Sequence, residues 1–305
     1  MIAGLAGAAG LAPAAGSAKR IPICAFSKHF QWTDVKGTAE VAASLGYDGV
    51  DLTLRAGGHV LPERVEEDLP KAAEIIRKTG LEIPMVTTAI VDAKSPHAEK
   101  IVKTLAALNI RRYRWDTFRY NEKTGIPEQL AEIKPRVKDL AAMNKEYGVC
   151  SMYHTHSGIG RVGASFWDLY LLLKDFDPDA VSVNYDIGHA TVEGGFGGWI
   201  NSTRLLMPYT RGIAVKDFKW TRNAKGAWIP GWCALGQGMV NFKQFFAFVK
   251  QSGFSGPLQL HMEYDELGGA DAGKPEFTIP KEKLLAIMKR DIDTLKAMVR
   301  EAGLA

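Results

Sequence analysis

Short β-rich runs alternate with amphipathic stretches of helical length through most of this 305-residue chain. From residue 21 onward, each β-rich run leads through a polar or glycine-containing loop into apolar residues spaced three or four positions apart. This spacing places the apolar side chains on one face of a helix. Eight such units are present, and their strands are predicted at residues 21–27, 49–53, 82–88, 110–115, 149–154, 181–186, 212–216 and 257–263.

A regular alternation of strands and helices predicts parallel strands, because each helix must return the chain to the starting edge of the sheet. An open, doubly wound sheet would show the same alternation, but no Gly-x-Gly-x-x-Gly turn follows the first strand. Eight regular units favour a closed barrel. We therefore predict an α/β fold in which residues 21–305 form a single (β/α)8 TIM barrel with eight parallel strands.

The longest predicted loop follows the seventh strand, at residues 220–238, and contains Trp220, Trp228 and Trp232. Loops at the carboxyl end of a barrel carry function, and aromatic faces stack on the apolar faces of pyranose rings. The loop is therefore interpreted as a lid or a sugar platform. A hydrophobic flap that packs on the barrel or on a partner subunit would have the same composition, so the sequence leaves both interpretations open.

Charge and cysteine usage exclude some classes of protein. The net charge of +4 is small and the basic residues are scattered through helical segments, so a nucleic-acid partner is not predicted. Cys24, Cys150 and Cys233 form no Cys-x-x-Cys pair and are interpreted as buried or semi-buried thiols.

The first 20 residues differ in composition from the rest of the chain. They are almost wholly Ala, Gly, Leu and Pro until Lys19 and Arg20, although the positively charged start of an export signal is lacking. We predict that residues 1–20 are an export-signal remnant, or alternatively a disordered tail, and that the protein is periplasmic or secreted. A cytoplasmic location follows if the stretch is not a signal. The stretch is too short and too weakly apolar for a membrane span.

Ionisable side chains gather where the predicted strands end. Six of the seven histidines lie at these positions, and only His97 does not. Function in a parallel barrel collects at the carboxyl ends of the strands, so these groups are expected to converge on one rim. The histidines concerned are His29, His59, His154, His156, His189 and His261.

The two-residue period of a strand selects the side chains that point inward together. His154, Asp186 and His261 each lie at the end of a predicted strand and are predicted to share the interior of the barrel. Imidazole nitrogens and carboxylate oxygens are ligands for divalent ions. We predict that these three residues bind one divalent metal ion, of which Mn²⁺, Zn²⁺, Co²⁺ and Mg²⁺ are candidates.

Four motifs occur in a fixed order around the eight strands. They are the segment 49–63 that ends in GGHVLPE, the Asp186-x-x-His189 pair, the Val215-Lys216-Asp217 run and the closing segment GPLQLHMEY at 256–264. Together they resemble the sugar phosphate isomerase/epimerase group of the xylose-isomerase-like TIM barrel superfamily, over residues 21 to about 300. The resemblance implies a divalent metal held by strands five to eight, with Asp186 as one ligand and His189 near the substrate.

The chain also departs from the pattern that the resemblance implies. Many relatives have metal-binding glutamates where this chain has His154 and His261, and a histidine where it has Ala214. Replacing two carboxylates by imidazoles removes the usual acid/base pair. Proton transfer is therefore assigned to Glu263, Lys216 and His156, with His189 as a further candidate. Substrate binding is assigned to His189, Arg55, His59, Lys28, Arg114 and Trp115.

The function predicted from these residues is a metal-dependent sugar isomerase or epimerase that moves a proton next to a carbonyl of a small carbohydrate. A lyase or dehydratase acting on a keto-sugar or cyclitol shares the first step and is the main alternative. A non-catalytic sugar-binding barrel is a second alternative, whereas a three-metal DNA-repair endonuclease would need more carboxylates. A free sugar or glycoside is the favoured substrate for an exported protein, and a homo-oligomer is compatible with the sequence.

Overall fold

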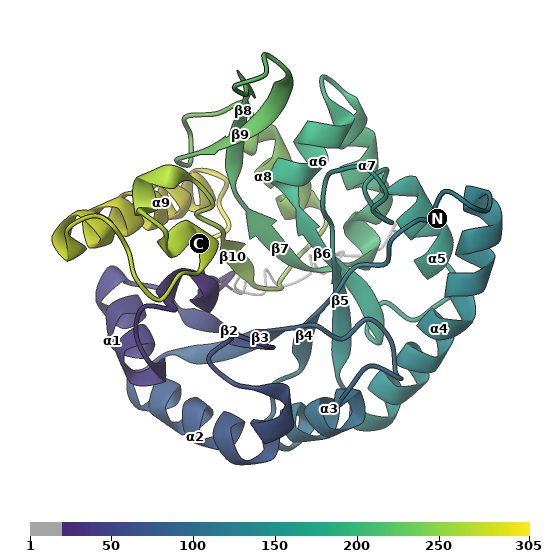
Figure 1. Ribbon diagram of the computed structural model, residues 1–305, viewed down its shortest axis with the longest axis horizontal. Helices are drawn as coiled ribbons and strands as arrows, with labels where there is room; N and C mark the ends of the chain where they lie inside the picture. The colour runs from purple at the N-terminus through teal and green to yellow at the C-terminus, as the bar shows by residue number, and fades with distance from the viewer. Residues whose placement is uncertain (1–19) are drawn as a thin grey trace, which may run out of the picture.

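Eight parallel strands form a closed barrel in the computed structural model, which describes residues 20–305. Figure 1 shows these strands at the centre of the molecule with the helices arranged around them. Each strand pairs with its neighbour along the chain, and β10 closes the ring by pairing with β1. The barrel strands are β1 Ile23–Phe26, β2 Gly49–Leu54, β3 Glu82–Thr88, β4 Arg112–Trp115, β5 Cys150–His154, β6 Val181–Asp186, β7 Thr210–Val215 and β10 Leu258–Leu260. The predicted TIM barrel is confirmed.

Helices cover the outside of the barrel with the apolar faces that the sequence pattern predicted. In α8 the four buried residues are Phe242, Phe245, Phe246 and Val249, and Phe245 stacks against Tyr185 of β6 with ring centroids 6.0 Å apart. The last helix, α9, lies next to α1, so the two ends of the barrel domain meet (Figure 1). The α-helices are α1 Val35–Leu45, α2 Val65–Lys78, α3 Ala98–Ala107, α4 Ile126–Tyr147, α5 Trp167–Leu173, α6 Ile187–Gly194, α7 Gly198–Leu206, α8 Phe242–Gln251 and α9 Lys281–Glu301.

The segment after β7 is an antiparallel hairpin and not the long loop predicted from the sequence. Strands β8 Asp217–Arg222 and β9 Trp228–Cys233 pair over their whole length, and Figure 1 shows them projecting beyond the barrel. Pro230 and Gly231 interrupt the strand pattern of this segment, which hid the hairpin in the sequence. The carboxylate of Asp217 fixes the base of this hairpin. It accepts hydrogen bonds from the backbone N–H groups of Phe218, Gly236, Gly238 and Val240.

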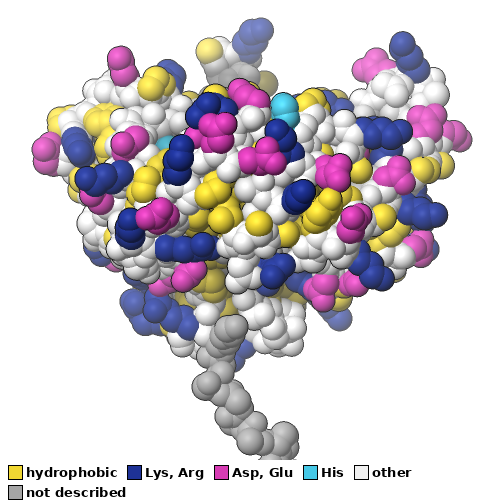
Figure 2. All heavy atoms as spheres, turned by 90° about the horizontal axis from the view of Figure 1, so that it is seen from below, with side chains coloured by type: hydrophobic (Ala, Val, Ile, Leu, Met, Phe, Trp, Pro, Cys, Tyr) yellow, Lys and Arg dark blue, Asp and Glu magenta, His cyan; other side chains and the backbone are white. Residues whose placement is uncertain are grey.

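Basic and acidic side chains are interspersed over the face shown in Figure 2. Among residues 20–305, no helix is long and apolar enough to cross a membrane. Cys24 and Cys150 are buried, Cys233 is half-buried, and all three thiols are free. Residues 1–19, which hold nearly all of the predicted export signal or tail, lie outside the described residues.

Candidate active site

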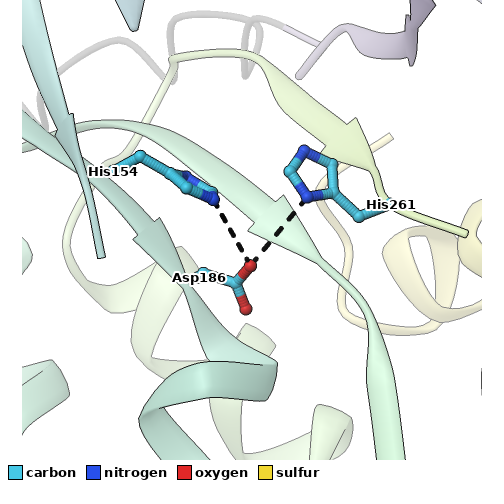
Figure 3. Close-up of side chains that lie close together, drawn as sticks. All are labelled: His154, Asp186 and His261. Atoms are coloured by element: carbon cyan, nitrogen blue, oxygen red, sulfur yellow. Dashed lines mark ion pairs between the residues drawn. The ribbon is translucent and has the colours of Figure 1, made fainter. Parts of the chain in front are cut away.

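Three side chains from β5, β6 and the end of β10 converge inside the carboxyl end of the barrel. Figure 3 shows the rings of His154 and His261 on either side of the Asp186 carboxylate. Nε2 of His154 lies 3.8 Å and Nδ1 of His261 lies 4.0 Å from Oδ2 of Asp186. All three side chains are buried. The structure therefore brings together the three residues that the sequence assigned to a metal ion.

The two carboxylate oxygens of Asp186 have different neighbours. Asp186 ends β6 and is the N-cap of α6, where Oδ1 accepts the backbone N–H of His189 at 2.9 Å. Such a cap satisfies one of the free N–H groups at a helix start. It also fixes the carboxylate so that Oδ2 faces the two histidines. This explains the Asp-x-x-His spacing physically, because the third residue of the helix supplies the capped N–H.

Two atoms of this cluster are buried without a hydrogen-bond partner among residues 20–305. They are Oδ2 of Asp186, whose nearest cation is Nζ of Lys216 at 3.2 Å, and Nδ1 of His261. Buried polar atoms are normally hydrogen-bonded, and an unpaired one costs free energy. One ion between the two atoms would satisfy both. The ligand atoms of His154, Asp186 and His261 lie within 4.8 Å of one another, so the residues present fit a divalent metal.

Asn184 orients the ring of His154 from the same strand as Asp186. Its side-chain amide lies 3.2 Å from Nδ1 of His154. If His154 binds a metal through Nε2, its Nδ1 carries the ring proton and donates a hydrogen bond to the amide oxygen of Asn184. Amide oxygen and nitrogen are assigned from the hydrogen-bond network, and the oxygen of Asn184 otherwise has no partner among the described residues. Phe26 supports the other histidine, because its ring stacks on His261 at 4.5 Å.

Lys216 is a buried cation next to the three metal-binding candidates. Its Nζ lies 2.8 Å from Oε2 of Glu263 and 3.2 Å from Oδ2 of Asp186. Burial lowers the pKa of Lys216, but these two carboxylates raise it further, so the net shift is upward. Lys216 is therefore a permanent ammonium donor at neutral pH.

Glu263 lies between two lysines at the edge of the cluster. Its Oε1 contacts Nζ of Lys28 at 3.1 Å, and its side chain is 24% exposed. Burial raises the pKa of Glu263, but Lys216, His261 and Lys28 hold it well below its usual range. Glu263 is thus ionised, and it marks the side of the cluster that solvent reaches.

His189 is neutral because of its hydrogen bonds. Nζ of Lys216 lies 2.7 Å from Nε2, which must accept the bond, so Nδ1 carries the proton and donates to Oγ of Ser157 at 2.7 Å. Burial, followed by the charge of Lys216, lowers the pKa of His189 well below its usual range. Ser157 was missed from the sequence, because only the folded chain brings the loop after β5 to α6.

His156 presents a free ring nitrogen to the same space. Its Nδ1 lies 3.2 Å from the backbone oxygen of His154 and donates to it, which leaves Nε2 unprotonated. Burial, Arg114 and Lys216 together lower the pKa of His156 well below its usual range. His156 is therefore a neutral imidazole at the mouth of the barrel.

The hairpin adds Trp232, which covers the cluster from β9. The ring of Trp232 lies 4.3 Å from Nζ of Lys216 and meets the edge of His189 at 4.8 Å. Trp228 instead is exposed and packs under Arg222. Only one of these two hairpin tryptophans therefore belongs to the site.

Two residues assigned to the substrate take part in local hydrogen bonding instead. The indole N–H of Trp115 donates to the backbone oxygen of Val91 at 2.8 Å, and the ring is 1% exposed. His59 contacts Thr38 through Nε2 and Thr53 through Nδ1. Trp115 is thus a packing residue, because strand alternation turns it away from the barrel interior. His59 fastens the loop after β2, and the structure brings neither residue to the metal-binding candidates.

Eight parallel strands with an ionisable cluster at their carboxyl ends define an enzyme-like TIM barrel. A family profile described as Xylose isomerase-like TIM barrel matches residues 39–298. The chain belongs to this family.

Related proteins and structures include both epimerases and a dehydratase. Inosose dehydratase from Lacticaseibacillus casei is 26% identical over 171 residues, which are 52% of this chain and 53% of the relative. The chain thus spans about half the length of the curated relatives it matches. A xylose isomerase-like TIM barrel protein from Mycobacterium smegmatis, solved with magnesium, has a TM-score of 0.67 at 16% identity, covering 93% of this chain and 98% of that one. L-ribulose 3-epimerase has a TM-score of 0.65 at 15% identity, covering 93% and 97%. The two structural likenesses show the fold.

Proposed function

We propose that this protein is a metal-dependent isomerase or epimerase that moves a proton next to a carbonyl of a small carbohydrate. The observation that carries the proposal is a pair of buried ligand atoms. Among residues 20–305, Nδ1 of His261 has no hydrogen-bond partner, and Oδ2 of Asp186 has only the ion pair with Lys216 at 3.2 Å. His154, Asp186 and His261 would hold the metal. A divalent ion at this place supplies a Lewis acid for the substrate carbonyl.

The side chains around the cluster stabilise the developing charge and transfer the proton. The positive charge of Lys216 stabilises the oxygen on which negative charge develops when the neighbouring C–H bond breaks. Glu263 is the ionised group that accepts this proton, and the contact with Lys28 holds its carboxylate in place. His156 offers its free Nε2 as a second proton carrier. Return of the proton to the opposite face gives an epimer, and return to the neighbouring carbon gives an isomer.

The nearby tryptophan protects this chemistry from water. Trp232 lies over Lys216, so the ammonium keeps its contacts with His189, Glu263 and Asp186. Removing water strengthens each of these interactions, because the effective dielectric constant falls.

Elimination is the second candidate function, and the partial match to inosose dehydratase favours it. The first step is the same removal of a proton next to a carbonyl. If a hydroxyl group on the next carbon then leaves, Glu263 passes on to it the proton that it accepted in the first step, so that water is released. The two outcomes differ in the mass of the product.

The test combines metal analysis with proton exchange. The protein is dialysed against Zn²⁺, Co²⁺, Mn²⁺ or Mg²⁺, assayed for bound metal, and incubated in D₂O with a panel of ketoses, keto-glycosides and keto-cyclitols. We expect about one ion per chain and deuterium incorporation next to the carbonyl, both lost in Asp186→Ala. Asp139→Ala is the matched control, because Asp139 is an exposed acid on α4.

The possible results separate the candidates. Deuterated product of otherwise unchanged mass supports isomerisation or epimerisation, whereas loss of water from the product supports elimination. Bound sugar without turnover, or absence of metal from every form, contradicts the proposed function.

A further inference from the structure

Arg114 of β4 is a buried cation without an ion-pair partner in the described part of the chain. The residue is 9% exposed, and Nε is buried with no hydrogen-bond partner among residues 20–305. Within the same part of the chain, its guanidinium group forms no ion pair. A buried charge is normally paired, because transfer from water to the protein interior is costly.

The side chain of Arg114 points into the barrel. Strand alternation places it on the opposite side of β4 from Tyr113, whose hydroxyl bonds to Asn144 on the covering helix α4 at 2.7 Å. Burial is the main cause of the low pKa of both His154 and His156, and Arg114 is the strongest charged influence on each of them. In the pairing of β4 with β5, Arg114 lies opposite Met152, which shares the inward face of β5 with His154. Arg114 therefore lies next to β5, on the side of the barrel opposite β10.

Two further arginines border this part of the barrel mouth. Burial is the main cause that lowers the pKa of Arg114. The positive charge of Arg55, just after β2, lowers this pKa further. Arg161, in the loop after β5, lowers the pKa of His156. Both side chains are half-buried. Arg55 directly follows β2, Arg114 lies on β4 and Arg161 follows β5, so the three residues belong to the sector of the barrel formed by the adjacent strands β2 to β5.

The acids nearby do not neutralise this sector. Asp51, Asp116 and Glu263 raise the pKa of Arg114, but none forms an ion pair with it within residues 20–305. Both oxygens of Asp51 accept the hydroxyl of Thr87 at 2.9 Å, and burial raises its pKa to about 7. Glu263 is already paired with two lysines. Positive charge is left over beside the metal-binding candidates.

We propose that Arg114, flanked by Arg55 and Arg161, binds an anionic oxygen group of the substrate, a carboxylate or a phosphate, while the substrate carbonyl faces Asp186. A guanidinium fork binds both groups with two parallel hydrogen bonds. The substrate class is then a sugar acid or a sugar phosphate, in place of the neutral sugar or glycoside expected from the sequence. This inference rests on the proposed function for the position of the carbonyl.

Binding experiments on the metal-loaded protein test the subsite. Calorimetry at constant ionic strength compares inorganic phosphate with acetate, and then D-glucuronate and glucose 6-phosphate with glucose. Wild type is compared with Arg114→Met and Arg114→Lys. Arg112→Met is the matched control, because Arg112 lies on the same face of β4 but lines a cavity at the amino end of the barrel with Met207 and Thr210.

We expect wild type and Arg112→Met to bind at least one anionic probe tenfold or more tightly than glucose. Arg114→Met should lose this preference while it keeps its metal, and Arg114→Lys should recover part of it. The better of the two sugar probes decides between carboxylate and phosphate. Equal affinity for charged and neutral probes in wild type, or a preference that survives in Arg114→Met, would overturn the proposal.

Failure of the subsite and failure of the proposed function give different results. A preference for anions that follows Arg114 in a protein without metal or proton exchange would leave the subsite standing and reject the isomerase. Metal binding together with proton exchange on neutral sugars alone would support the proposed function and reject the anion subsite.

Discussion

Oδ2 of Asp186 and Nδ1 of His261 face one another at 4.0 Å, and both are buried without a hydrogen-bond partner among residues 20–305. They come from strands that are not adjacent, since β7 lies between β6 and β10. Each atom is a good metal ligand, and the only cation next to Oδ2 among the described residues is Lys216 at 3.2 Å. This relationship is the strongest argument for a metal site in the chain.

The ligand types predict which metal is preferred. Two imidazoles and one carboxylate suit Zn²⁺ or Co²⁺ better than Mg²⁺, which favours oxygen ligands. We expect wild type to bind Zn²⁺ at least 100-fold more tightly than Mg²⁺. The double variant His154→Glu, His261→Glu should narrow that ratio, measured by competition with a chelator of known affinity. An unchanged ratio would contradict the assignment of the two histidines as ligands.

Asn184 is expected to support metal binding without touching the metal. Its amide contacts Nδ1 of His154 at 3.2 Å and sets which ring nitrogen is free. Loss of such a supporting contact typically costs about 10- to 100-fold in metal affinity. Asn184→Leu should show a loss of this size, and Asn184→Asp, which keeps an acceptor, should not. Equal affinity in both variants would show that the amide does not orient the ring.

Trp232 should affect catalysis, whereas Trp228 should not. Trp232 lies over Lys216 at 4.3 Å, and Trp228 is 60% exposed on the same strand. Trp232→Ala admits water to the ammonium, so we expect kcat/KM to fall at least tenfold on the substrate found by the exchange screen. Trp228→Ala serves as the control and should keep wild-type kinetics. Similar values for the two variants would place the hairpin outside the site.

Asp51 should make the protein less stable as the pH rises. Burial raises its pKa from 3.8 to about 7. A carboxyl group whose pKa is raised by folding stabilises the folded state below its unfolded pKa, and this contribution is lost as pH rises to the folded pKa. The free energy of unfolding should therefore fall between about pH 4 and pH 7, by at most about 1.4 kcal/mol per pH unit.

The variant Asp51→Asn isolates this effect. Asn keeps a neutral group opposite Thr87, so the variant should match wild type near pH 4 and exceed its melting temperature at pH 8. Urea unfolding at both pH values gives the corresponding free energies. A variant that is less stable than wild type at pH 8 would show that Asp51 is ionised and stabilising in the folded protein.

The sequence by itself determined the barrel and the metal-binding candidates. Alternation of period-two and helical patterns specified eight parallel strands, and the carboxyl ends of parallel strands must share one rim. His154, Asp186 and His261 could be found because each lies at the end of a strand, at a position whose side chain points into the barrel. These are local properties of each segment.

Only the tertiary structure decided which other polar groups join them. Trp115 lies at a strand end, but its position in the strand turns its side chain outward, toward the backbone oxygen of Val91. His59 instead forms hydrogen bonds with neighbouring residues, including one with Thr38. Trp232 reached Lys216 because the segment after β7 folds back as a hairpin. Such contacts depend on the closure and register of the barrel, which join residues far apart in the chain.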